Sequence, residues 1–164
     1  MERLWSPWRM QYISNAKSSG ECIFCAEFAP RGSNPLYRTE LSIVMLNAFP
    51  YNTGHVMVAP GRHVGALGEL TTAERHDLMD VTTLATTVID HAFNPHGYNV
   101  GMNLGATAGA GIPGHLHIHV VPRWEGDTNF MPVVAETKVL PEMLAETESK
   151  LRPGFAKSGR EQEV

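Results

Sequence analysis

Residues 115–121 read His-Leu-His-Ile-His-Val-Val, so that imidazole and apolar side chains alternate along the chain. Alternation with a period of two predicts a β-strand, because successive side chains of a strand point to opposite faces of its sheet. Leu116, Ile118 and Val120 would share one face, and the three histidines would share the other. Apolar side chains would pack better on that face than three imidazoles, which titrate near neutral pH. Their presence there therefore indicates a chemical role.

A glycine-rich segment, residues 105–114, precedes the histidines. Glycine lets backbone N–H groups approach a ligand closely and adopt positive φ angles, so such a segment can bind an anion. Backbone donors followed by a row of imidazoles favour phosphoryl chemistry, in which one imidazole serves as nucleophile or general acid. The alternative is a glycine-rich turn before a solvated edge strand, and the three alternating histidines argue against it.

Length and composition predict a single globular domain. The chain has 164 residues, of which 43% are hydrophobic and 18% are charged, as in ordinary soluble proteins. The first residues do not resemble a signal peptide and no apolar run of about 18 residues occurs, so we expect a cytoplasmic protein without a membrane partner. The formal net charge of −4 argues against a nucleic-acid partner, although local donors can still bind a small phosphorylated ligand.

The remaining pattern predicts an α+β fold with an antiparallel sheet. Residues 41–46 and 55–59 predict two strands of a hairpin, and residues 98–104 predict another strand that delivers Asn103 to the glycine-rich segment. Residues 71–74 have the spacing of a capping box, and the apolar residues that follow them keep to one helical face. A long helix is therefore expected between two pairs of strands.

The two ends of the chain differ from its centre. Residues 1–21 form an aromatic-containing extension, and residues 22–152 are expected to form the domain. A last helix is predicted from about Leu140 to Leu151, with Pro153 and the glycine after it lying beyond its end. Residues 153–164 would then be a polar tail.

Cys22 and Cys25 are the two cysteines of the chain and have Cys-x-x-Cys spacing. In a reducing compartment this spacing favours half of a zinc site over a structural disulfide. A tetrahedral site needs two further ligands, and from the residues alone two reduced, packed cysteines are an equally good interpretation. His63 is either a surface histidine or a third ligand.

The pattern His-φ-His-φ-His-φ-φ, where φ is apolar, resembles the signature of the histidine triad superfamily of nucleotide hydrolases and transferases. The resemblance covers about residues 22–124. It implies a five-stranded antiparallel sheet with a long helix and a C-terminal helix, and a homodimer that joins two sheets into one of ten strands. Residues 4–9 and 119–132 are similar to the bacterial branch that includes diadenosine tetraphosphate phosphorylases, also called ATP adenylyltransferases.

The resemblance also implies roles for particular residues. His117 would be the nucleophile that attacks the α-phosphorus of a dinucleoside polyphosphate and forms a covalent adenylyl-histidine. His119 would assist the leaving oxygen, and His55 would support the triad. Contacts to the nucleotide are implied for Asn47, Asn103, Gly111 and His119.

The same resemblance bears on metals. It implies a structural zinc held by Cys22, Cys25, His63 and His115, which makes zinc the preferred interpretation of the cysteine pair. A divalent ion such as magnesium would travel with the polyphosphate, although the sequence contains no carboxylate cluster dedicated to it.

Three other functions are alternatives to a phosphorylase. A hydrolase of dinucleoside polyphosphates or nucleoside phosphoramidates differs only in that water takes the adenylyl group. A nucleotide-binding regulator would tolerate replacement of the nucleophile, whereas all three histidines are present. Repair of adenylylated DNA ends would require a basic surface, which this acidic chain does not offer.

Overall fold

The structure is a computed structural model that describes residues 22–29, 35–127 and 140–161. The predicted extension over residues 1–21 lies outside this description, as does the end of the 119–132 segment. The elements, in chain order, are α2 (Ile23–Phe28), β1 (Tyr37–Arg38), β2 (Ser42–Leu46), β3 (Val56–Pro60), the 3-10 helix η1 (Leu67–Glu69), α3 (Thr72–Phe93), β4 (Gly97–Gly101), the 3-10 helix η2 (Ala106–Ala108), β5 (Ile118–Arg123) and α5 (Leu144–Glu161).

The strands form one five-stranded sheet in the order β1-β2-β3-β5-β4, and all neighbours are antiparallel. The predicted α+β class and the five-stranded antiparallel sheet are therefore confirmed. The two predicted hairpin strands are β2 and β3, which pair over their full length. Strand β5, which carries His119, lies between β3 and β4 and so occupies the interior of the sheet.

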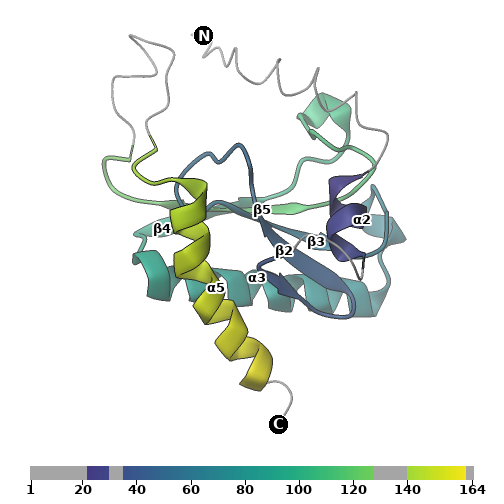
Figure 1. The fold of residues 1–164 in the computed structure, drawn as a ribbon. Helices are drawn as coiled ribbons and strands as arrows, with labels where there is room; N and C mark the ends of the chain where they lie inside the picture. The colour runs from purple at the N-terminus through teal and green to yellow at the C-terminus, as the bar shows by residue number, and fades with distance from the viewer. Residues whose placement is uncertain (1–21, 30–34, 128–139, 162–164) are drawn as a thin grey trace, which may run out of the picture.

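The alternation of side chains gives the sheet two different faces. Val44, Val58 and Ile118 are fully or almost fully buried and belong to a core that includes residues of α3 and α5. Met57 and Ala59 point the other way and pack with Phe24 of α2 in a second, smaller cluster. Figure 1 shows the corresponding arrangement, with α3 along one side of the sheet and α2 on the other. One face therefore builds the core, and the opposite face is available for the site.

Helix α3 begins where the sequence predicts. Thr71 is its N-cap, and the side chains of Thr71 and Glu74 form the reciprocal bonds of a capping box. Asn94 ends the helix in the left-handed conformation, with φ of 47°. None of the helices in the described part of the chain combines the length and the apolar character that a membrane span requires.

Strand β5 begins at Ile118, so the predicted strand start at His115 is wrong. The β3–β5 register pairs Val58 with Ile118, and its continuation would place Leu116 opposite Pro60. Proline has no N–H to donate to the ladder, so the pairing ends there. The backbone N–H of Leu116 donates instead to the carbonyl of Val64, at 2.7 Å.

The last helix also differs from the prediction. It starts at Leu144 and runs through Pro153 to Glu161, whereas the sequence predicted an end at Leu151. Leu151 and Phe155 are both fully buried and lie one helical turn apart on the face that packs into the core. Their burial offsets the backbone hydrogen bond that Pro153 removes. The predicted polar tail therefore begins within a packed helix.

Candidate functional site

His55, His117 and His119 gather on the sheet face opposite α3. The side chains of Val56 and Val58 point into the core, so His55 and Met57 of the same segment point to the other face. Met57 pairs with His119 across the β3–β5 ladder, which places His119 on this face beside His55. The ring centroids of His117 and His119 are 4.9 Å apart, and those of His55 and His119 are 5.2 Å apart.

A hydrogen bond to the backbone fixes His117 in one tautomer. Its Nδ1 lies 2.9 Å from the backbone carbonyl oxygen of His115, so Nδ1 carries the proton and donates it. Its Nε2 therefore has an available lone pair when the ring is neutral. Burial lowers the pKa of His117, which keeps the ring neutral at pH 7. The Phe24 ring packs against it at a centroid distance of 4.9 Å. A neutral imidazole with a fixed lone pair is the form that can act as a nucleophile.

His55 and His119 are linked in a second fixed pattern. The backbone N–H of Tyr51 donates to His55 Nδ1 at 3.0 Å, so a neutral His55 carries its proton on Nε2. His55 Nε2 lies 3.0 Å from His119 Nδ1 and donates to it. His119 therefore carries its own proton on Nε2. The cluster thus combines an unprotonated nitrogen on His117 with a proton-bearing nitrogen on the neighbouring His119.

Asn47 lies at the edge of this cluster. Its Oδ1 accepts the backbone N–H of Phe49 at 2.9 Å, which leaves its Nδ2 facing His55 Nε2 at 3.4 Å. Both of these nitrogens carry hydrogens in the tautomer set by Tyr51, so this contact is not a hydrogen bond. The Asn47 amide is thus directed into the site next to the histidines.

The four predicted metal ligands form one cluster. The thiol and imidazole ligand atoms of Cys22, Cys25, His63 and His115 all lie within 4.8 Å of one another. Cys22 Sγ is 3.3 Å from His115 Nδ1, and Cys25 Sγ is 3.2 Å from His63 Nδ1 and 3.6 Å from His115 Nδ1. Ligand atoms of a tetrahedral zinc site are about 3.3 to 3.8 Å apart, given Zn–S and Zn–N bonds of about 2.3 and 2.0 Å. The donor set and these three sulfur–nitrogen distances fit zinc.

A backbone carbonyl orients His115 for this cluster. His115 Nε2 donates to the Pro60 carbonyl oxygen at 2.7 Å, so Nδ1 presents its lone pair to the thiols. This is the outer-shell bond that metal-ligating histidines usually make. Burial lowers the pKa of His115, which is fully buried. His115 thus contributes its ring to the cysteine cluster and its carbonyl oxygen to His117.

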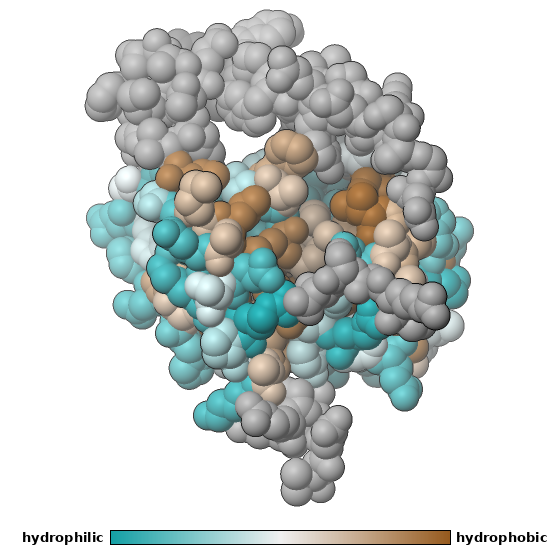
Figure 2. Space-filling view, in the orientation of Figure 1, coloured by the Kyte–Doolittle hydropathy of each residue, from teal (hydrophilic) through white to brown (hydrophobic). Residues whose placement is uncertain are grey.

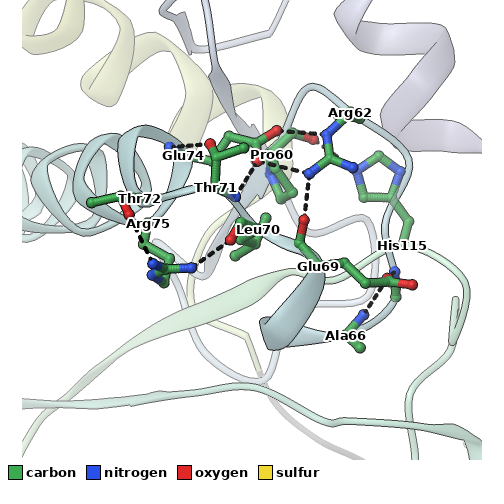
Figure 3. A network of polar contacts seen from close by, with 11 residues as sticks. Pro60, Arg62, Ala66, Glu69, Leu70, Thr71, Thr72, Glu74, Arg75 and His115 are labelled. Carbon is green, nitrogen blue, oxygen red and sulfur yellow. Dashed lines mark hydrogen bonds and ion pairs between the residues drawn. The ribbon is translucent and has the colours of Figure 1, made fainter.

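The loop that carries His63 is tied to the start of α3 (Figure 3). The Arg62 guanidinium donates to both carboxylate oxygens of Glu74 at 2.8 Å and also bonds the Glu69 carbonyl oxygen. Arg62 hydrogen bonds lower the pKa of Glu74 to about 2, with help from the backbone N–H of Thr71. The Glu69 carboxylate closes the loop by accepting two further backbone N–H groups, from residues 65 and 66.

The glycine-rich segment ends beside the histidines. Gly105 and Gly109 have φ of 82° and 89°, values that side-chain-bearing residues rarely adopt. Ile112 packs against the Phe24 cluster, and its carbonyl oxygen accepts the N–H of His115 at 3.2 Å. Gly111 and Asn103 are half-buried, with Gly111 in this segment and Asn103 two residues beyond β4. Their predicted contacts to a nucleotide stay predictions.

Three contributors to the site were missed in the sequence. Phe24 packs against His115 and His117, the Tyr51 backbone sets the His55 tautomer, and the Pro60 carbonyl orients His115. Phe24 lies inside the Cys-x-x-Cys motif, which could have drawn attention to it. Backbone donors and acceptors leave no trace in a sequence, so the other two could not have been found.

Large apolar side chains are exposed near the site. Phe49 and Tyr51 have 63% and 42% of their surface exposed, and the Tyr51 ring lies 4.9 Å from that of His55. In Figure 2, hydrophobic residues on the displayed face gather around α2 and at the start of α5. Exposed aromatic rings beside polar groups suit a ligand that has a planar base.

Comparisons with known proteins agree with this geometry. The HIT domain family matches residues 31–126, more than half of the chain. An AP-4-A phosphorylase of Mycobacterium tuberculosis is 40% identical over 167 residues, covering 96% of this chain and 86% of that protein. An asymmetrical bis(5'-nucleosyl)-tetraphosphatase of Schizosaccharomyces pombe is 39% identical over 98 residues, covering 60% of this chain and 53% of that protein.

A solved structure shows the same architecture. A hypothetical histidine triad nucleotide-binding protein of Sulfolobus tokodaii aligns with a TM-score of 0.64 and 27% identity, covering 84% of this chain and 91% of that one. The fold, the histidine cluster and the sequence matches agree. The chain belongs to the HIT domain family.

Proposed function

We propose that this chain cleaves dinucleoside polyphosphates such as diadenosine tetraphosphate through a covalent adenylyl intermediate on His117. The relatives named as AP-4-A phosphorylase and bis(5'-nucleosyl)-tetraphosphatase support this substrate class. The observation that carries the proposal is that the neighbouring rings of His117 and His119 have complementary tautomers. His117 has its lone pair on Nε2, and His119, 4.9 Å away between ring centroids, has its proton on Nε2.

The chemistry follows from these two nitrogens. The Nε2 lone pair of His117 attacks the α-phosphorus, and the electron pair of the breaking P–O bond stays with the departing polyphosphate. His119 Nε2–H donates a hydrogen bond to that leaving oxygen, where negative charge develops. An acceptor then attacks the adenylyl-histidine from solution and returns the lone pair to His117.

Inorganic phosphate is the acceptor that we propose, as in the AP-4-A phosphorylase relative. The second candidate is water, which is favoured by the likeness to a tetraphosphatase. We also propose that the nucleotide is contacted by Asn47, Asn103 and Gly111. The Asn47 amide is directed into the site beside His55.

One experiment tests the substrate and the acceptor together. Diadenosine tetraphosphate is incubated with the enzyme with and without inorganic phosphate, and products are separated by chromatography. Phosphorolysis gives ADP and ATP only when phosphate is present, whereas AMP and ATP without added phosphate would contradict phosphorolysis and support hydrolysis.

The His117→Ala variant tests the nucleophile in the same assay. We expect turnover to fall by at least about 10³-fold, because the covalent route is lost. His91→Ala is the matched control, since His91 lies on the exposed side of α3 and bonds only within its own helix among the described residues. Full turnover by His117→Ala would remove His117 from the mechanism.

We propose zinc for the Cys22, Cys25, His63 and His115 cluster, on the strength of its donor set and spacing. When bound, zinc supplies a structural cross-link between α2, the loop after β3 and the segment before β5. The chain's own groups carry the reaction, since no ligand of this cluster is the proposed nucleophile. Magnesium accompanying the polyphosphate stays a prediction.

Metal analysis of protein purified without chelator checks this assignment. We expect about one zinc per chain in the wild type and less than about one tenth of that in Cys25→Ser. Ser149→Ala, on the exposed side of α5, is the control and should keep its zinc. A wild-type zinc content near zero would dismiss the metal site.

We also propose that the enzyme is a cytoplasmic homodimer. Thiol ligands persist in a reducing compartment, which supports the cytoplasm as its location. A homodimer formed along β4 is supported by the position of that strand at one end of the sheet and by the exposure of residues 99–101.

A further inference from the structure

A polar network outside the histidine cluster holds the loop between β2 and β3. Asn52 is 7% exposed, and its Nδ2 donates to the Pro122 carbonyl oxygen at 3.1 Å and to Asp127 Oδ2 at 2.9 Å. Both partners are acceptors, so the orientation of the amide is determined by them. The side chain thereby fastens the loop to the end of β5.

The acceptor carboxylate is itself fixed. Arg123 donates to both oxygens of Asp127, at 2.6 and 2.8 Å, and the backbone N–H of Trp124 donates to Oδ2 at 3.2 Å. The Arg123 hydrogen bonds lower the pKa of Asp127 to about 2, so the carboxylate is ionised at neutral pH. Arg123 is anchored in turn by Asn99 of β4, at 2.7 Å.

This loop supplies the donor that sets the His55 tautomer. Asn52 is the residue after Tyr51, whose N–H donates to His55 Nδ1, and the Asn52 carbonyl oxygen accepts the N–H of His55 at 3.2 Å. A displacement of Asn52 would therefore move the Tyr51 N–H away from the ring. His55 could then carry its proton on Nδ1. Its Nε2 would become an acceptor, so His119 would donate from Nδ1 and no longer carry its proton on Nε2.

We propose that Asn52 and Asp127 are positioning residues that keep the proton of His119 on Nε2, facing the leaving group. The Arg123–Asp127 pair fixes the position of Asn52, and Asn52 in turn fixes the position of the Tyr51 N–H. That N–H sets the tautomer of His55, and the His55–His119 hydrogen bond then sets the tautomer of His119. The role of His119 toward a leaving group rests on the proposed function, whereas the ring protonation pattern does not.

The protonation pattern is measured first, without substrate. Long-range proton–nitrogen NMR spectra of the full chain distinguish protonated from unprotonated ring nitrogens. We expect Nε2–H on both His55 and His119 in the wild type, and a clear Nδ1–H population on His119 in Asn52→Ala and Asp127→Asn. Thr83→Ala is the control, because Thr83 is exposed on α3 and its hydroxyl bonds the Met79 carbonyl oxygen of the same helix, and it should keep the wild-type pattern.

Kinetics supply the second readout. Adenosine 5'-phosphoramidate has an amine leaving group that must be protonated, whereas the p-nitrophenyl ester of AMP releases a stable anion. We expect kcat of Asn52→Ala and Asp127→Asn to fall about ten- to hundredfold with the phosphoramidate and less than about threefold with the ester. KM should change less than about twofold with either substrate.

The outcomes separate this inference from the proposed function. Unchanged ring protonation in both variants would overturn the positioning role even if diadenosine tetraphosphate is cleaved. An equal loss with both leaving groups would show a merely structural role and would also overturn it. A shifted protonation pattern in an enzyme that does not cleave diadenosine tetraphosphate would support the positioning role and contradict the proposed substrate. Asp127→Asn keeps the test decisive if Asn52→Ala does not fold.

Discussion

Glu74 shows how one buried carboxylate connects stability to pH. Its side chain is 7% exposed and bonds Arg62 and the backbone of Thr71, which together hold its pKa at about 2. The folded-state pKa lies below the ordinary value of 4.5. The ionised carboxylate therefore stabilises the fold fully above about pH 4.5, and this contribution is lost as the pH falls towards 2.

The Glu74→Gln variant tests this account. We expect the free energy of unfolding at pH 7 to fall by about 1–2 kcal/mol, because a charge-assisted bond to a half-exposed arginine is lost. The difference from the wild type should narrow between about pH 4.5 and about pH 2 in urea unfolding curves. Glu148→Gln, at a more exposed pair on α5, should cost less than about 0.5 kcal/mol. A pH-independent difference for Glu74→Gln would contradict the assigned pKa.

Some features of the site could be predicted from the amino-acid sequence, and others could not. The alternating histidines and the Cys-x-x-Cys spacing were visible, and the structure brings Cys22, Cys25, His63 and His115 together. Which nitrogen of each ring carries a proton was not visible, because it depends on the carbonyl of His115 and the N–H of Tyr51. Such backbone partners are set by the fold and not by residue type.

At the scale of elements, helix α5 lies unusually close to α3 at Gly154. A Cβ built on Gly154 would lie 2.8 Å from Val88 Cγ1, closer than real Cβ atoms approach other atoms. Val88 is buried and has a stiff, β-branched side chain, so it cannot easily move away. The glycine that a sequence reader takes for a helix stop is here a packing residue.

Gly154→Ala should therefore destabilise the protein, even though alanine favours helix. We expect a loss of about 1–2 kcal/mol, with the overpacking penalty exceeding the propensity gain of about 1 kcal/mol. Thermal unfolding measures it, and Gly68→Ala is the control because nothing lies within 4 Å of the added Cβ. In a Val88→Ala background the same substitution should be neutral or stabilising. A higher Tm for Gly154→Ala alone would refute the close contact.

Elements with strong local signals were predictable, and those decided by distant contacts were not. The capping box at Thr71 and Glu74 gave the start of α3 because cap and helix are neighbours in sequence. The start of β5 depends on Pro60, which lies on a different strand, and the course of α5 depends on the core that buries Phe155. Both errors arose where tertiary contacts outweighed local preference.

At the scale of the whole molecule, β4 lies at one end of the sheet, and no other strand of the described residues pairs with its outer edge. Residues 99–101 of this strand are exposed, and Val100 has 49% of its surface accessible. An exposed apolar edge is a liability for a monomer and a template for pairing with a second strand. Two copies joined there would form the ten-stranded sheet that the resemblance implies.

Light scattering coupled to size-exclusion chromatography tests the dimer. We expect a mass of about 36 kDa, twice the 18.0 kDa of one chain. Val100→Asp should shift the protein towards a monomer by placing a charge in the interface. Leu67→Asp changes an apolar residue of similar exposure on η1 and should leave the dimer intact. A wild-type mass of 18.0 kDa would contradict the proposal.

The double attachment of His115 has a practical consequence for mutagenesis. Its imidazole belongs to the cysteine cluster, while its peptide oxygen holds the ring of His117. An alanine at this position deletes the first connection and leaves the atoms of the second in the chain. Lost turnover in such a mutant would thus report on how firmly the cluster braces the backbone, and it would not identify His115 as a group that meets the substrate.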